Sequence, residues 1–416
     1  MPYMILNKFP ILLCSVLTVY VHSQTNNLTS SPYSLFGLGV ESNSGLGKNK
    51  GLGNSGIARK DDFAINDLNP ASLASVNKQM FIFDIGSDVE VDFVSDRSND
   101  ETRFAGNFSN VGFGFNANGK LGVSLTLQPA TNVGYNLLGL VGEIEGSTDQ
   151  FISNVAGSGG INNISVAAGY PLTHNLNVGT RLYYLFGRIE ETESVLIEDT
   201  FLTIEEISLY KNFQMGVGMQ YDVKGLFAIG ATVDFPTVLN AVQDRTVQKT
   251  LDFMPTITEA TENEPIADFS LPLDIGMGIS TQKLESFSIS VDYRKRYWGS
   301  TGQEDDIGEY VDQEILAFGA AYVPNSNGLN YWDHVNFRMG LSYDSGYLKV
   351  NDTAIENYSL SLGIGFPIGK KGSSINLAYN YKQNGTFGGV LVEESINTFS
   401  LNFTLSDIWF QKRFYD

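Results

Sequence analysis

The amino-acid sequence predicts an all-β fold, a 14-stranded antiparallel transmembrane β-barrel with an N-terminal lumenal plug. Apolar and polar residues alternate with a period of two along most of the chain, as in strands with one apolar face. The polar face of these segments is rich in Gly and Ser, whereas strands of soluble proteins favour Thr, Lys and Glu toward water. The alternating segments run to about ten residues or more, the length with which a tilted strand crosses a bilayer.

The composition agrees with a wall that faces lipid, and it excludes several functions. Charged residues are 17% of the chain, against about 25% in average soluble domains, while aromatic residues reach 12%. The formal net charge of -20 argues against nucleic-acid binding, which needs a basic face. One Cys and three His are too few for a Cys-rich zinc site or a disulfide framework. We therefore expect no nucleic-acid partner, no metal and no cofactor.

Fourteen segments have the length and alternation of membrane strands, and an even number suits a closed bacterial barrel. One of them places Phe399, Leu401 and Phe403 on one face, with Ser400 and Asn402 on the other. Aromatic residues gather near the strand ends, as in the interfacial girdles of membrane barrels. The predicted strands cover 80–93, 103–117, 120–139, 160–170, 176–190, 205–221, 225–245, 268–280, 286–297, 312–323, 334–348, 356–366, 373–384 and 395–405.

The connections between these segments alternate in length. Those after even-numbered strands are mostly tight, such as Asn118-Gly119, although the turn 324–333 is longer than others of its class. Those after odd-numbered strands are mostly longer and often acidic, as at 140–159, 191–204 and 246–267. Outer-membrane barrels have short periplasmic turns and longer outside loops. The alternation therefore predicts that the acidic stretches are outside loops and that both termini are periplasmic.

The chain divides into three predicted parts. Residues 1–23 have the composition of a secretory signal peptide, with Lys8 ahead of an apolar run that is too short to span a bilayer as a helix. Residues 24–78 contain three Gly-Leu-Gly repeats and few β-branched runs. Because a barrel of this size has a lumen to fill, we expect 24–78 to form a plug, or hatch, inside the transmembrane barrel of residues 79–416.

Two positions are candidate functional sites. Asn69, Pro70 and Ala71 lie between the Gly-rich segment and the first predicted strand, and we expect the plug to move there. Pro129 interrupts the third predicted strand, although proline cannot donate to a ladder and a closed barrel has no edge to hold it. We therefore expect a bulge, kink or gap at Pro129 and Ala130, which we interpret as a lateral opening. The alternative is that the strand ends there at the membrane interface.

Few other residues of the sequence are candidates for catalysis or for ligand binding. His174 and His334 lie in a turn and at a strand start, with no Gly-x-Ser-x-Gly motif near either, so we expect no enzymatic activity. The basic run of Arg294, Lys295 and Arg296 has two interpretations. It binds lipid head groups, or it pairs with acidic neighbours at the outer end of a strand.

Both ends of the chain resemble a known family. Ser31-Pro32-Tyr33-Ser34-Leu35-Phe36-Gly37-Leu38-Gly39, the stretch 51–58 and Asn69-Pro70-Ala71-Ser72-Leu73 resemble the N-terminus of Bacteroidota members of the FadL/TodX-like outer-membrane transport superfamily. The C-terminal stretch 405–416 is similar to theirs as well. PorV of the type IX secretion system belongs to the same broad superfamily. The resemblance implies a fourteen-stranded barrel, an N-terminal hatch and the passage of hydrophobic molecules.

The resemblance leads to one expected function and two alternatives. The expected function is a passive outer-membrane channel for small hydrophobic molecules such as long-chain fatty acids, with outer-membrane lipid around it. Family members with a kinked third strand release their ligand sideways, which implies that role for Pro129 and Ala130. The first alternative is a PorV-like partner protein of a type IX secretion or surface assembly. The second is a structural barrel whose lumen stays plugged.

Overall fold

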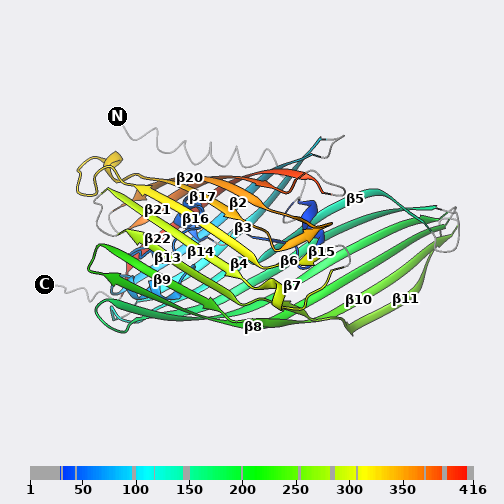
Figure 1. Ribbon diagram of the computed structural model, residues 1–416, viewed down its shortest axis with the longest axis horizontal. Helices are drawn as coiled ribbons and strands as arrows, with labels where there is room; N and C mark the ends of the chain where they lie inside the picture. Colours follow the sequence, from blue (N-terminus) through cyan, green and yellow to red (C-terminus); the bar gives the residue numbers. More distant parts are fainter. Residues whose placement is uncertain are drawn as a thin grey trace, which may run out of the picture.

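The computed structural model describes residue 29 and residues 31–42, 45–95, 100–116, 118–143, 150–197, 200–251, 254–281, 286–305, 308–369, 372–386 and 391–409. These residues form a closed 14-stranded antiparallel β-barrel, as the alternation predicts (Figure 1). The first strand of the wall, β2 (Met80–Ser95), pairs with the last, β22 (Glu393–Ile408), and this pairing closes the barrel. The predicted signal peptide 1–23 and the C-terminal residues 410–416 lie outside the described residues.

Most strands of the wall are continuous. They are β3 (Asp100–Asn116), β6 (Gln150–Pro171), β7 (Leu176–Ile197), β8 (Thr200–Val223), β14 (Phe287–Arg296), β16 (Gln313–Tyr322), β17 (Asn336–Asp344), β20 (Asn357–Ile368) and β21 (Ser373–Asn384), together with β2 and β22. Each pairs antiparallel with its neighbours. Apart from one side of residues 100–110 in β3, the backbone hydrogen bonds of these segments are therefore satisfied within the wall, as a membrane-spanning structure requires.

Three strands of the wall are interrupted, and a proline lies at each interruption. The interrupted strands are β4 (Gly122–Pro129) with β5 (Thr131–Glu143), β9 (Phe227–Asp234) with β10 (Thr237–Leu251), and β11 (Met254–Pro265) with β12 (Phe269–Leu271) and β13 (Asp274–Thr281). Pro129 ends β4, Pro236 separates β9 from β10, and Pro272 separates β12 from β13. Proline has no N–H to donate to a ladder, so each of these positions weakens the strand locally.

The remaining elements are short. They are η1 (Pro32–Leu35), β1 (Val40–Glu41), η2 (Gly47–Leu52), η3 (Pro70–Ser75), η4 (Trp298–Ser300), β15 (Gly308–Tyr310), η5 (Tyr331–His334), β18 (Leu348–Val350) and β19 (Thr353–Ala354). The strands β15, β18 and β19 form a small separate sheet. The long turn 324–333 contains the start of η5. Among the described residues, no helix has the length and apolar character needed to cross a membrane.

The predicted alternation is confirmed in the packing of the wall. In β22 the side chains of Phe399, Leu401 and Phe403 are exposed to the outside, whereas Asn402 and Thr404 are buried toward the interior. Exposed apolar side chains recur in the same way on the other wall strands, for example on β7, β8 and β17. The outer surface is therefore apolar and the interior polar, which is the reverse of a soluble domain.

Where acidic outside loops were expected, the strands continue instead. The stretches 140–159, 191–204 and 246–267 are mostly ladder, because β5 to β8, β10 and β11 extend past the rest of the wall at one end (Figure 1). The pairs Ser194↔Thr203 and Gln248↔Thr203 are examples of this polar ladder. Thr and Val alternate there with Glu and Ser, and such a sequence satisfies its backbone hydrogen bonds as a sheet in water.

The N-terminal segment, described at residues 31–42 and 45–79, lies inside the barrel (Figure 1). Glycines of the wall make room for it: a Cβ at Gly230, Gly340 or Gly363 would meet the backbone of residues 51–58. The buried side chains form two apolar clusters, and both combine the segment with the wall. One contains Tyr33, Phe36, Leu38, Phe269, Trp298 and Tyr310, and the other contains Leu46, Ile65, Leu73, Val76, Ile82 and Ala167.

Candidate functional site

The predicted motif Asn69-Pro70-Ala71 is fully buried between the segment and the wall. Asn69 precedes η3, and its Oδ1 accepts a hydrogen bond of 3.0 Å from the backbone N–H of Ala71. Its Nδ2 donates to the Ile57 carbonyl at 2.8 Å and to the Met219 carbonyl of β8 at 3.0 Å. Because one amide joins two parts of the segment to the wall, Asn69 is an attachment point of the N-terminal segment.

Pro129 and Ala130 lie where the wall pairing stops. β3 pairs with β4 only from Asn116↔Gly122 to Val111↔Leu127, and it makes no further pairs on this side among the described residues. β5 pairs with β6, and at Thr131 and Asn132 it pairs with β1 of the N-terminal segment. Residues 100–110 of β3 therefore have no ladder with β5, whose first two residues pair with β1 instead.

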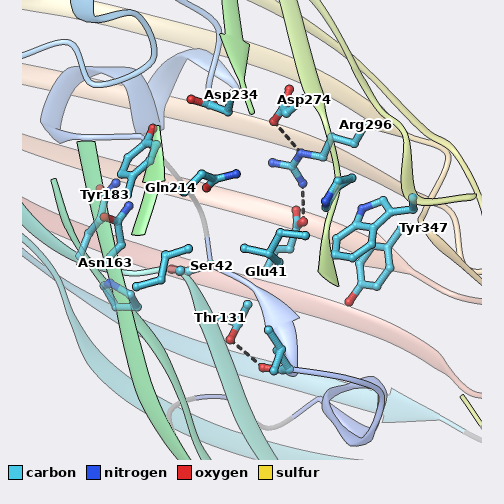
Figure 2. Close-up of a pocket in the computed structure, with 18 of the residues that line it drawn as sticks. Glu41, Ser42, Thr131, Asn163, Tyr183, Gln214, Asp234, Asp274, Arg296 and Tyr347 are labelled. Atoms are coloured by element: carbon cyan, nitrogen blue, oxygen red, sulfur yellow. Dashed lines mark hydrogen bonds and ion pairs between the residues drawn. The ribbon is translucent and has the colours of Figure 1, made fainter. Parts of the chain in front are cut away.

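A cavity of about 220 Å³ lies beside this interruption, between the N-terminal segment and the wall (Figure 2). Pro129, Ala130 and Pro272 line it, so the cavity is at the level of the interrupted strands. One side is apolar and aromatic and consists of Leu38, Leu185, Phe269, Leu271, Trp298 and Tyr310. The Trp298 ring stacks on Tyr347, with 5.1 Å between the ring centroids. The cavity thus offers an apolar surface against which a small molecule can pack.

The other side of the cavity consists of ion pairs. Arg181 on β7 makes a two-pronged pair with Asp234 on β9, in which Nε donates to Oδ1 at 2.8 Å and Nη2 donates to Oδ2. Its Nη1 donates to the Asp67 carbonyl at 2.7 Å. Both side chains of the pair are almost fully buried, with exposed fractions of 5% and 9%. Arg181 therefore ties two wall strands and the N-terminal segment together.

A second group of ion pairs centres on Asp274 of β13. Arg294 and Arg296 of β14 both donate to this carboxylate, at 2.5 Å and 2.9 Å to Oδ2. Arg296 also donates to Glu41 of β1, and Figure 2 shows it between Asp274 and Glu41. Lys295 points to the other face of the strand, where its Nζ lies 3.4 Å from Glu314. The interpretation that this basic run pairs with acidic neighbours is confirmed.

A smaller cavity of about 70 Å³ lies on the other side of β1. Ala105 and Phe108 of β3 line it, together with Asn132 of β5. Glu41, Ser42 and Pro129 line both cavities. The strip of chain around β1 is therefore the partition between the main cavity and the unpaired part of the wall.

Among the charged side chains of the cavity, only the basic run 294–296 was singled out from the sequence, and Arg181 and Asp234 were not. The alternation places Arg181 and Asp234 on the inner face of their strands. The sequence does not show, however, that the two side chains lie at the same height along the barrel axis. A signal was present in Pro272, which lines the same cavity as Pro129. Within the described residues, no group of three His, Cys, Asp or Glu side chains is placed to hold a metal ion.

The fold is the one found in solved outer-membrane channels of the FadL/TodX type. The P. putida toluene transporter TodX has a TM-score of 0.63 at 14% identity, over 89% of this chain and 100% of that one. The Ralstonia pickettii toluene transporter TbuX has a TM-score of 0.58 at 18% identity, over 86% and 98%. A Pseudomonas aeruginosa FadL homologue has 0.59 at 9% identity, over 89% and 99%. At these identities the likeness is one of fold.

The family follows from the sequence itself. The BamG family profile matches residues 4–416, and the chain belongs to the BamG family. No curated protein matches the chain. The resemblance to the FadL/TodX-like superfamily is confirmed by the fold, whereas the similarity to PorV and the Bacteroidota origin stay predictions.

Asp67 gives the N-terminal segment a pH-dependent attachment. Its carboxylate accepts hydrogen bonds of 3.3 Å from the Leu46 N–H and from Gln128 Nε2. Burial raises the pKa of Asp67 to about 6, although these hydrogen bonds oppose the rise. Since the ordinary pKa is about 3.9, the folded state favours the protonated carboxyl, and this stabilisation is complete below about pH 4 and lost as the pH rises through about 6.

We expect Asp67→Asn to remove this pH dependence, because the amide stays neutral. In the unmodified protein, hydrogen exchange of the Leu46 N–H, which donates to Asp67, should accelerate as the pH rises through about 6, after correction for the intrinsic rate. In the variant the exchange of this N–H should stay constant over the same range. Asp352→Asn, in an exposed turn, is the matched control and should behave like the unmodified protein. Equal pH profiles for the unmodified protein and Asp67→Asn would contradict the role of Asp67.

Proposed function

We propose that this chain is a passive outer-membrane channel for small hydrophobic molecules, and that the 220 Å³ cavity holds them during passage. The observation that carries the proposal is the aromatic and aliphatic surface that Leu38, Phe269 and Trp298 form in a cavity inside a closed barrel. Burying 100 Å² of an apolar solute there contributes about 2.5 kcal/mol. Solved structures of the same fold are a monoaromatic hydrocarbon channel, CymD, and the toluene transporter TodX, which supports the proposal.

The same proposal places the barrel in the outer membrane with its termini in the periplasm. The apolar outer surface of the wall supports the membrane location. The start of β2 and the end of β22 lie at the end of the barrel opposite the extended strands (Figure 1). Long outer extensions and tight periplasmic turns are the usual arrangement, and it supports periplasmic termini.

In this proposal residues 24–78 act as the plug, and Asn69, Pro70 and Ala71 anchor it. Ion pairs of Lys48 with Asp61, at 2.9 Å, and of Lys60 with Asp222 stabilise the segment. No energy source is needed, because the solute moves down its gradient. The segment around β1 would shift to let a solute pass from the main cavity toward the interruption at Pro129.

The lateral opening at Pro129 and Ala130 is the proposed exit. The unpaired stretch of β3 and the 70 Å³ cavity behind it support a sideways route into lipid. We expect Ala105→Trp, which fills that cavity from β3, to slow uptake severalfold while leaving the main cavity intact. Phe104→Trp is the matched control, because this neighbouring side chain is 66% exposed on the outer face. Uptake through Ala105→Trp at the rate of the control would contradict a lateral exit.

The experiment that tests the channel itself is uptake by whole cells. A strain without this chain should take up labelled toluene and labelled long-chain fatty acid more slowly than the parent strain, for at least one of the two solutes. Re-expression of the chain should restore the parental rate. Parental rates for both solutes in the deletion strain would reject the channel, and so would a rate that re-expression leaves unchanged.

A second candidate is a role as the partner of another protein, and the edge of β5 favours it. Along Asn136–Gly142, β5 pairs with β6 on one side and with nothing described on the other. Leu138 and Val141 on this edge are 69% and 64% exposed, and the stretch has no charge. Another free edge, that of β11, carries Pro255, Pro265, Glu259, Glu262 and Glu264, residues that discourage strand addition. An extended segment of another polypeptide would fit the β5 edge.

Photocrosslinking in cells separates the two candidates. A crosslinking residue at Leu138 should trap one defined polypeptide if β5 is a docking strand. The same residue at Ile257, which is 64% exposed on β11, is the matched control. Val141→Lys in the chain that carries the crosslinking residue should abolish the adduct without changing solute uptake. Equal labelling at both positions would exclude the docking role.

A further inference from the structure

We infer that the main cavity selects small uncharged molecules that carry one hydrogen-bonding group on an apolar body, and that it rejects carboxylates. This inference rests on the proposed channel function and names the substrate class of the same cavity. It differs from the expectation of long-chain fatty acids. The cavity wall provides three independent observations for it: the pairing of its charges, its unpartnered polar atoms and its volume.

The charges of the cavity are already compensated among themselves. Its lining contains three guanidinium groups, those of Arg181, Arg294 and Arg296, and each lies against a carboxylate. The lining also contains four carboxyl groups, those of Glu41, Asp67, Asp234 and Asp274. With Asp67 ionised the lining has one excess negative charge, and with Asp67 protonated it is neutral. A ligand carboxylate would therefore find no unpaired cation.

Entry of a carboxylate would have to break one of these pairs. Arg181 and Asp234 are held by two parallel hydrogen bonds and are nearly fully buried, so separating them would leave a buried aspartate without its cation. The alternative is to bury the ligand carboxylate itself without a partner, which is also unfavourable. Either way, the ionised ligand is disfavoured relative to a neutral ligand of the same shape.

Two buried polar atoms of the lining have no partner among the described residues. They are Oδ1 of Asn163 on β6 and the indole Nε1 of Trp298 in η4. Asn163 and Trp298 are 8% and 6% exposed. A buried polar group without a hydrogen bond is costly, and a bound molecule that supplies one removes the cost. Both atoms are covered, so the Asn163 amide and the Trp298 ring must turn toward the cavity to reach a ligand. A hydroxyl could then donate to the amide oxygen, and a carbonyl or hydroxyl could accept from the indole.

The volume sets the size of the molecule. A cavity of about 150 Å³ lined by apolar side chains holds one benzene molecule. The cavity described here, at about 220 Å³, has room for one ring with a few further heavy atoms. Leu38, Phe269 and Leu271 would contact the ring, while Asn163 and Trp298 would contact the polar group. The structure therefore points to compounds such as aromatic alcohols, phenols or ketones.

A matched pair of probes tests the inference: 4-methylbenzyl alcohol and 4-methylbenzoate, with toluene as the apolar reference. Binding to the purified full-length barrel in detergent is measured by calorimetry at about pH 7.5, where the benzoate is ionised. We expect the alcohol to bind at least about tenfold more tightly than the benzoate. Asn163→Leu should weaken binding of the alcohol more than binding of toluene.

Two variants reverse the selection if the ion pairs enforce it. Asp234→Asn leaves the guanidinium of Arg181 without its carboxylate, and Glu41→Gln removes one of the two carboxylates that face Arg296. In each variant the benzoate should gain at least about tenfold in affinity relative to the alcohol. Glu41→Gln keeps the wall pairs intact, so it remains informative if Asp234→Asn does not fold.

The outcomes distinguish the inference from the function on which it rests. Equal binding of the alcohol and the benzoate by the unmodified barrel, with toluene bound, overturns the selection rule and leaves the channel standing. An unchanged ratio in a folded variant overturns the role of the ion pairs. Absence of binding for all three probes overturns both the selection rule and the cavity as a site of passage.

Discussion

Replacing Arg181 by methionine is expected to lower the free energy of unfolding by about 3–5 kcal/mol, the usual cost of leaving one member of a buried ion pair without its partner. The Asp234 carboxyl would remain in a site that is 9% exposed, without its cation and without the two hydrogen bonds from Arg181. The Asp67 carbonyl would lose its hydrogen bond as well. Urea unfolding in lipid, followed by the heat-modifiable migration of the folded barrel, measures the change.

Two companion variants separate this effect from general damage to the strand. Arg188→Met removes a cation from the same strand, but Arg188 and Glu190 are 51% and 48% exposed, so a loss below about 1 kcal/mol is expected. The double variant Arg181→Met with Asp234→Leu should recover most of the stability, because no buried charge is left. A loss in Arg181→Met no larger than in Arg188→Met would show that the pair is not structurally important.

Replacing Gly340 by valine is expected to expel part of the N-terminal segment from the barrel wall. A Cβ at Gly340 on β17 would overlap the backbone of Leu52 and Gly53. Gly53 has a φ of 63°, a left-handed conformation that ends η2 and leaves the backbone little freedom to move aside. Overpacking of this kind costs about 1–3 kcal/mol or more. Residues 45–57 should become open to proteolysis, and the outer membrane should become permeable to large polar antibiotics.

Met339→Val is the matched control for Gly340→Val. Met339 is the preceding residue of the same strand, and its side chain is 43% exposed on the outer face. This change should affect neither the protease sensitivity of residues 45–57 nor antibiotic permeability. If Gly340→Val is as resistant and as impermeable as Met339→Val, then the close packing of the segment against β17 does not seal the lumen.

The wall could be predicted from the sequence because membrane strands repeat one simple pattern. Each of the fourteen predicted segments coincides with a strand of the barrel, including the strand broken at Pro129. The breaks at Pro236 and Pro272 were not predicted, because apolar alternation continues on both sides of each proline. The acidic extensions were predicted as loops, since polar strands in water lack the apolar face on which the prediction depended.

The site could be predicted only in part. Pro129, which lines the cavity, could be singled out from the sequence because a proline inside a strand of a closed barrel is unusual. Arg181 and Asp234 are 53 residues apart, and they meet only through the registers of β7, β8 and β9. Such a register is set by hydrogen-bond pairing along the whole wall, which the alternation does not specify. The cavity therefore required the three-dimensional structure.

In the proposed channel, the extended strands would also affect how fast different solutes reach the cavity. Glu191, Glu193 and Glu206 lie on the face of this sheet that continues the interior of the barrel, with Arg245 beside Glu206. Their field reaches about 8 Å into a solution of physiological ionic strength. An anion diffusing toward the lumen meets repulsion there, whereas a neutral solute does not. In the proposed channel, anions would therefore associate more slowly than neutral solutes before either reaches the cavity. This difference in association rate would become smaller in high salt.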